Sequence, residues 1–219
     1  MQRSRALTLL ILAAIPGGAG IVDRIAVIVG THVIKTSDIE RELRVASFLN
    51  RQPVDESSAA MHRAADRLID QELVREELLS GQYTAPTERD ATAFLQQLKR
   101  DRFNASETQF QAELGRHHLT EDQLKRQLLW QVTVLRFIDQ RFRAGVLVTD
   151  EEVTAYHQQH HAELQPTDPR SSTPEAMQGR IREILTGERI NQAFEEWLAE
   201  RRRATRIDYR PQAFIGSTQ

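Results

Sequence analysis

Residues 21–49 carry the pattern that most constrains the fold, because a short hairpin there runs directly into a helix. Residues 25–29 read IAVIV, a run that suits a β-strand. Gly30 then begins a short turn in which positive φ is tolerated, and Val33 and Ile34 resume the extended pattern. A two-stranded hairpin is marginally stable alone and needs a third strand or a packed helix. The chain must therefore supply a partner for this hairpin.

A second short β-like run lies near the other end of the chain. Residues 206–210 read RIDYR, in which Ile207 and Tyr209 alternate with polar side chains. We predict that this run returns to pair with the hairpin, so that the two ends of the chain close one domain. We expect residues 212–219, which follow the strand, to contribute little to stability.

A recurring capping signal predicts that the chain between these strands is helical. In each case a hydroxyl residue precedes an acid or amide by three positions, the spacing of a capping box. The pairs are Ser37/Glu40, Thr87/Asp90, Ser106/Gln109, Thr120/Gln123, Thr149/Glu152 and Ser172/Glu175. The predicted fold is therefore mainly α, a multi-helix core with a small antiparallel β-sheet formed by the N-terminal hairpin and the C-terminal strand.

The apolar spacing predicts the extent of each helix. We expect helices over residues 37–50, 57–80, 87–102, 106–115, 120–143, 149–161 and 174–204. Residues 165–172, QPTDPRSS, read as a polar linker with two prolines. The apolar face of the last helix shifts at Gly187, so we expect that helix to contact two neighbours in succession.

The first 20 residues have the pattern of a signal peptide. Arg3 and Arg5 precede a ten-residue run, 6–15, that is apolar except for Thr8, and small residues follow at 18–20. The run is shorter than the roughly 20 residues that span a bilayer. We expect a signal peptide over 1–20, a periplasmic domain over 21–219 and no stable membrane insertion. The alternatives are an uncleaved anchor or a buried N-terminal helix.

Composition and motifs argue against several kinds of chemistry. The chain has no cysteine, so a disulfide, a thiolate zinc site and a thiol nucleophile are excluded, and a formal net charge of −2 argues against nucleic acid. His157, His160 and His161 would share one helix face, but their HQQHH frame lacks the glutamate of an HExxH site. Solvated polar residues are the simpler interpretation. We expect no metal, no cofactor and no catalytic residue.

The order of segments along the chain resembles a known family. The segments are VDRIAVIVGTHVIKTSDIERELR, LIDQELVREELLSGQYTAPTERD, SETQFQAELGRHHLTEDQLKRQL and VTDEEVTAYHQQHHAEL. This order resembles the N-terminal region of SurA-type periplasmic chaperones, which PpiC-type parvulin foldases share. The final segment, GRIREILTGERINQAFEEWLAERRRATRIDYRP, resembles the helix and strand that close those proteins after their isomerase domains.

The sequence departs from this family at the place of the isomerase. Family members carry parvulin domains before the closing helix, whereas only the nine residues 165–173 lie there in this chain, too few for a folded domain. By resemblance, a linker over 164–175 replaces the parvulin domain, and 176–219 form the closing helix and strand. The resemblance implies an ATP-independent chaperone that binds unfolded clients, such as outer-membrane protein precursors. It also implies that the protein is not an enzyme. The alternatives are a foldase related to prolyl isomerases and an adaptor for one folded partner.

Two short helices carry the candidate client-binding residues. These are Phe94, Leu98, Phe103, Phe110 and Leu114. An arm of two helices, joined at residues 103–105, cannot bury both of its faces, so its remaining apolar surface is suited to an extended client segment. The alternative is that these side chains pack against the helix that begins at Thr120, because apolar stripes on helices usually face a core.

Overall fold

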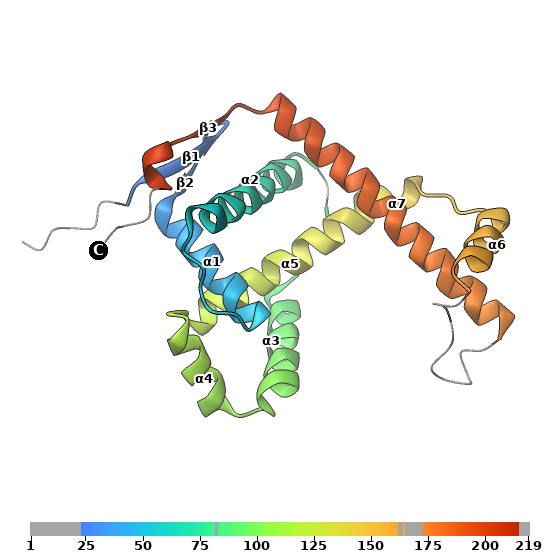
Figure 1. Ribbon diagram of the computed structural model, residues 1–219, viewed down its shortest axis with the longest axis horizontal. Coiled ribbons are helices and arrows are strands. Elements are labelled where there is room, and N and C mark those ends of the chain that lie inside the picture. Colours follow the sequence, from blue (N-terminus) through green and yellow to red (C-terminus); the bar gives the residue numbers. More distant parts are fainter. Residues whose placement is uncertain (1–22, 82, 162–163, 165–172, 215–219) are drawn as a thin grey trace, which may run out of the picture.

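The computed structural model describes residues 23–81, 83–161, 164 and 173–214 of the 219-residue chain. The expected signal peptide and linker residues 165–172 lie outside these ranges. The described part is mainly helical and contains a small antiparallel sheet, which confirms the predicted fold class (Figure 1). No helix in these ranges is both long enough and apolar enough to cross a membrane.

The helices follow the predicted order. They are α1 (Thr36–Asn50), α2 (Ser58–Ser80), α3 (Glu88–Phe103), α4 (Glu107–Arg116), α5 (Glu121–Phe142), α6 (Asp150–Gln159) and α7 (Pro174–Ala204), with short 3₁₀ turns η1 (Arg143–Gly145) and η3 (Pro211–Ala213). Thr87, Ser106, Thr120 and Thr149 occupy N-cap positions as predicted. The side chains of Ser106, Thr120 and Thr149 accept from amides of the first turn that have no partner within the helix, whereas the Thr87 hydroxyl donates to the Asp90 carboxylate.

One predicted helix start and one predicted capping residue differ from the structure. In α1 the Asp38 carboxylate accepts a hydrogen bond of 3.0 Å from the Lys35 backbone N–H, so the helix begins before Ser37. The Ser37 hydroxyl instead donates to Asp23 at 2.6 Å. In α7 the capping hydroxyl belongs to Thr173, which accepts from the third amide of the helix. Adjacent polar residues compete for the same cap, and sequence spacing alone does not choose between them.

The sheet contains the three predicted strands, β1 (Ile25–Val29), β2 (His32–Lys35) and β3 (Ile207–Tyr209). The strand order is β2-β1-β3, and both pairings are antiparallel. Gly30 turns the chain between β1 and β2 with a φ of 57°, a left-handed conformation that glycine adopts at little cost. The first strand is therefore central, and its second partner comes from the far end of the chain.

The first hydrophobic core lies between the sheet and helices α1 and α2. Val27 and Val29 lie on one face of β1, because side chains alternate across a strand. Both are fully buried, as are Ile39 of α1 and Ile69 of α2 in the same cluster. Leu198, near the end of α7, completes this core. The marginal hairpin is thus stabilised both by a third strand and by packed helices.

The residues after β3 also belong to this core. The side chain of Phe214 is only 2% exposed, and its ring stacks on His62 of α2 with 4.1 Å between centroids. Ala213 is buried beside it. The prediction that residues 212–219 contribute little to stability is therefore wrong for its first part, since a phenylalanine buried near a chain end ties that end down.

The long helix α7 joins the first core to a small separate one. Near its start, Ile181 packs with Val153 of α6 and with Leu164. Near its end, Leu198 packs beneath the sheet. Figure 1 shows α7 running from α6 to the sheet while crossing the end of α5. This helix contacts different neighbours in succession, as the shift at Gly187 predicts.

Candidate functional site

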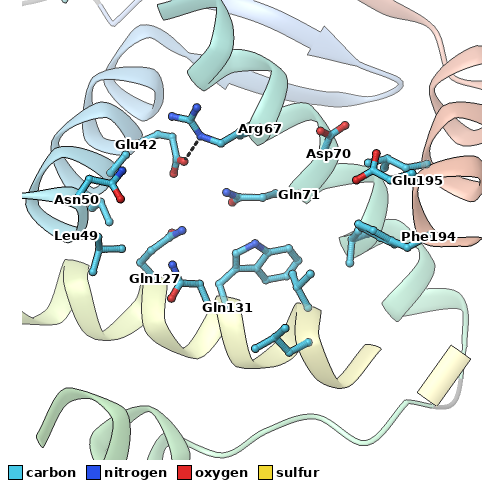
Figure 2. A pocket seen from close by; sticks show the side chains of 17 residues that line it. Glu42, Leu49, Asn50, Arg67, Asp70, Gln71, Gln127, Gln131, Phe194 and Glu195 are labelled. Atoms are coloured by element: carbon cyan, nitrogen blue, oxygen red, sulfur yellow. Dashed lines mark hydrogen bonds and ion pairs between the residues drawn. The ribbon is translucent and has the colours of Figure 1, made fainter. Parts of the chain in front are cut away.

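A groove of about 770 Å³ opens between α1, α2, α5 and α7 (Figure 2). Its apolar lining consists of Val45, Ala46, Leu49, Val74, Trp130, Val134, Leu135, Phe194 and Leu198. Its polar lining consists of Glu42, Asn50, Arg67, Asp70, Gln71, Gln127, Gln131 and Glu195. Ligand sites in proteins share this combination of apolar walls and a few polar groups. The groove is therefore a candidate ligand site in the described part of the chain.

Helix α5 forms one wall of the groove because it has two apolar faces. Leu124 and Leu128 point into the second hydrophobic core, between α1, α3, α4 and α5. Trp130 and Val134, four residues apart on another face, line the groove instead. Leu135 on the same wall keeps 64% of its surface exposed. One apolar face of α5 is buried in the second core, so the other apolar face is open to a ligand or partner.

The charged groups of the groove are mostly paired. Glu42 is buried on α1 and accepts a hydrogen bond of 2.8 Å from the Arg67 guanidinium of α2. Asp70 accepts from Arg202 of α7 at 2.5 Å. Burial raises the pKa of the Asp70 carboxyl above its ordinary value, and Arg202 partly opposes that rise. Glu195 makes no ion pair with any described residue, so it adds one unpaired negative charge at the α7 side.

A second hollow of about 290 Å³ lies beside the groove. The two hollows share five lining residues, Glu42, Val45, Gln71, Gln127 and Trp130. The second one reaches Val33 and Ile34 of the edge strand β2. The Arg75 guanidinium lies 4.9 Å from the centre of the Trp130 ring, where the two hollows meet.

The structure corrects part of the predicted client-binding surface. Phe110 is 0% exposed and Leu114 is 1% exposed, so neither can contact a client in this conformation. Phe110 packs edge-on against Phe48 of α1, with 6.3 Å between ring centroids. Both residues belong to the second core, as the alternative interpretation expected. The physical reason is that α4 turns its apolar stripe inward, toward α1, α3 and α5.

The other predicted residues lie at the margin of that core. Leu98 and Phe103 are partly buried against it, and only Phe94 has a mostly exposed side chain, at 52%. The connection after α3 turns sharply, as predicted, and both Asn104 and Ala105 have positive φ. The five residues therefore do not form one open surface, and Phe94 stands apart from the groove lining.

Sequence reasoning missed the groove residues Trp130, Leu135 and Phe194. The signal for Trp130 was that this large side chain falls outside the regular apolar stripe that Leu124 and Leu128 belong to on the same helix. A large apolar side chain in such a position suggests a second contact face. The sequence pattern does not say which helices lie opposite that face.

The histidines show no metal arrangement. The rings of His157 and His161 lie 5.6 Å apart between centroids, while Nδ1 of His160 lies 3.1 Å from the Tyr156 carbonyl oxygen. Within the described ranges, no group of three or more histidine, aspartate or glutamate side chains is placed to hold a metal ion.

A scan of the chain against protein-family models found no match, and a search of curated proteins found none either.

Proposed function

We propose that this protein is an ATP-independent chaperone that holds unfolded segments of exported proteins. The order of sequence segments, which resembles that of SurA-type chaperones, supports this proposal. In this proposal residues 1–20 direct export to the periplasm, and the clients are precursors of outer-membrane proteins. Prolyl isomerase activity forms no part of it, because residues 165–173 are too few for a parvulin domain.

The observation that carries the proposal is the open, apolar-walled groove between α1, α2, α5 and α7. Trp130 and Phe194 supply aromatic surface on two different helices, and Leu135 is 64% exposed beside them. Exposed apolar surface of this kind marks a place where another molecule binds. Weak apolar contacts at such a site shield a client segment and slow its aggregation without requiring a folded partner.

An aggregation-suppression assay with the purified protein tests the proposal. Leu135→Glu puts a charge on the groove wall at an exposed position, so we expect client protection to fall severalfold while the fold stays intact. Leu79→Glu is the matched control, because Leu79 is also an exposed helical leucine, at 80%, and lies outside the groove lining. Equal protection by both variants and the wild type would remove the groove from the proposal.

Two further measurements separate the alternatives. An adaptor should bind one folded protein tightly, whereas the proposed chaperone should bind many unfolded chains weakly. A foldase should accelerate isomerisation of a proline peptide, whereas we expect the uncatalysed rate, with a time constant of tens to hundreds of seconds at 25 °C. Acceleration that survives rigorous purification would favour the foldase.

A further inference from the structure

Four side-chain carboxamides line the groove from three helices. Asn50 belongs to α1, Gln71 to α2, and Gln127 and Gln131 to α5. In Figure 2 Gln71 lies across the groove from Gln127 and Gln131, and the only interaction drawn among the lining side chains joins Glu42 to Arg67. None of the four carboxamides hydrogen-bonds through its side chain to another residue of the described ranges. Their donors and acceptors are thus free for a ligand.

The free hydrogen-bonding capacity of the groove is mainly neutral. Arg67 is engaged by Glu42, and Asp70 is engaged by Arg202. Glu195, which has no ion-pair partner among the described residues, disfavours a negatively charged ligand nearby. The matching ligand therefore carries uncharged donors and acceptors beside apolar surface, which is the chemistry of a peptide backbone with apolar side chains.

We propose that the carboxamides of Gln71, Gln127 and Gln131 hydrogen-bond to the backbone of an extended, uncharged segment of an unfolded protein. The inference rests on the chaperone function proposed above and adds what the groove recognises. A carboxamide has the same donor and acceptor as a peptide group, so it can pair with either the N–H or the C=O of a client. Such recognition does not depend on client sequence.

The free carboxamides of the groove favour an extended segment over a helix. The three glutamines come from two helices, Gln71 from α2 and Gln127 and Gln131 from α5, so their carboxamides can reach more than one peptide group of a bound segment. An extended chain presents N–H and C=O groups along both edges, whereas a helix has already paired its own. Side chains of an extended segment alternate between its two faces, so half of them can contact the apolar wall at Trp130.

Isothermal titration calorimetry with two peptides tests the inference on the full mature protein. The first probe is a capped nine-residue peptide of valine, serine and threonine, and the second is the same peptide N-methylated at every second amide. Methylation removes donors, so we expect the wild type to bind the second peptide about tenfold more weakly, the loss of a few backbone hydrogen bonds.

Protein variants separate lost hydrogen bonds from the bulk of the methyl groups. In Gln71→Leu/Gln127→Leu/Gln131→Leu we expect the affinity ratio of the two peptides to approach one. Gln96→Leu is the control, since Gln96 is exposed on α3 outside the groove, and it should keep the wild-type ratio. If the triple variant shows no cooperative thermal unfolding by circular dichroism, the single variant Gln131→Leu replaces it, because Gln131 is exposed. We expect this variant to reduce the affinity ratio of the two peptides about threefold.

The outcomes distinguish this inference from the function on which it rests. If the wild type binds both peptides equally, or all variants show the same ratio, the carboxamides do not recognise the backbone, although the groove still binds peptide. If the wild type binds neither peptide, the proposed chaperone function fails and the inference fails with it.

Discussion

The hydroxyl of Tyr209 in β3 donates a hydrogen bond of 2.6 Å to the Asp66 carboxylate of α2. Arg202 near the end of α7 reaches the same helix, donating from Nε to the Asp70 carboxylate at 2.5 Å and from Nη2 to the Asp66 carbonyl at 2.8 Å. Charge-assisted hydrogen bonds therefore hold α7 and β3 to α2, and β3 also pairs with β1. These contacts join the C-terminal segment of the domain to its N-terminal strand and helices.

The buried end of the chain should matter for stability. Phe214→Ala should lower the free energy of unfolding by about 2–4 kcal/mol, because it removes a large side chain from the first core. Gln212→Ala, at an exposed neighbouring position, is the control and should change it by less than about 0.5 kcal/mol. Urea denaturation measures both. An unchanged midpoint for Phe214→Ala would mean that Phe214 does not pack in this core.

Deleting residues 206–219 removes β3 together with Phe214. The hairpin then loses its third strand, so we expect a loss of several kcal/mol, more than that of Phe214→Ala alone. Thermal unfolding of the truncated chain and of the chain without the deletion checks this. Identical melting temperatures would contradict the closure of the domain by its two ends.

Substitutions of the phenylalanines in α3 and α4 should differ in their cost in stability. Phe110→Ala should destabilise the protein by about 3–5 kcal/mol, since Phe110 is 0% exposed. Phe94→Ala should cost less than about 1 kcal/mol, because more than half of the Phe94 side chain is already in water. Chemical denaturation of the two variants gives the comparison. Similar losses in both would mean that α3 and α4 pack differently.

Lys99 should be an unusually costly lysine to replace. It is 8% exposed, its Nζ lies 3.0 Å from both Glu107 and Glu121, and it also lies 4.3 Å from the centre of the Phe110 ring. Lys99→Ala should cost about 1–3 kcal/mol, because it leaves both glutamates without their cation and opens a gap beside the second core.

Lys125 offers a matched control for this substitution. Its ammonium lies 3.5 Å from Glu88, which is mostly exposed, so Lys125→Ala should cost less than about 1 kcal/mol. Thermal melts of the two variants at low and high salt give the comparison. If Lys99→Ala were no more costly than Lys125→Ala, the Lys99 cluster would not stabilise the joint between α3, α4 and α5.

Tyr209 should make stability fall at alkaline pH. Burial, together with its hydrogen bond to Asp66, raises the pKa of Tyr209 from 10.0 to about 12. The unfolded chain therefore loses this proton first, so the stabilisation is complete below pH 10 and declines as pH rises toward 12. Tyr209→Phe should be less stable than the wild type at pH 8, and the difference should narrow above pH 10. A difference that stays constant across this range would contradict the contact with Asp66.

Short-range signals in the sequence determined most of the secondary structure. The extended runs at residues 25–29 and 33–34 and the alternation at 207–209 predicted the three strands, because a strand's side-chain period is local. Capping residues such as Thr120 and Thr149 marked helix starts, because a cap and its amide are three residues apart. Even the pairing of the chain ends followed from the need of a marginal hairpin for a third strand.

Only the tertiary structure decided which apolar faces are core and which are open. Phe94 and Phe110 look alike in the sequence, yet one is mostly exposed and the other fully buried. The groove depends on α1, α2, α5 and α7 meeting around Trp130, and residues from Glu42 to Leu198 line it. Apolar attraction is non-directional. An apolar stripe on a helix therefore predicts that this face is buried, but it does not determine which helix packs against it. The packing of the whole chain determines which helices meet.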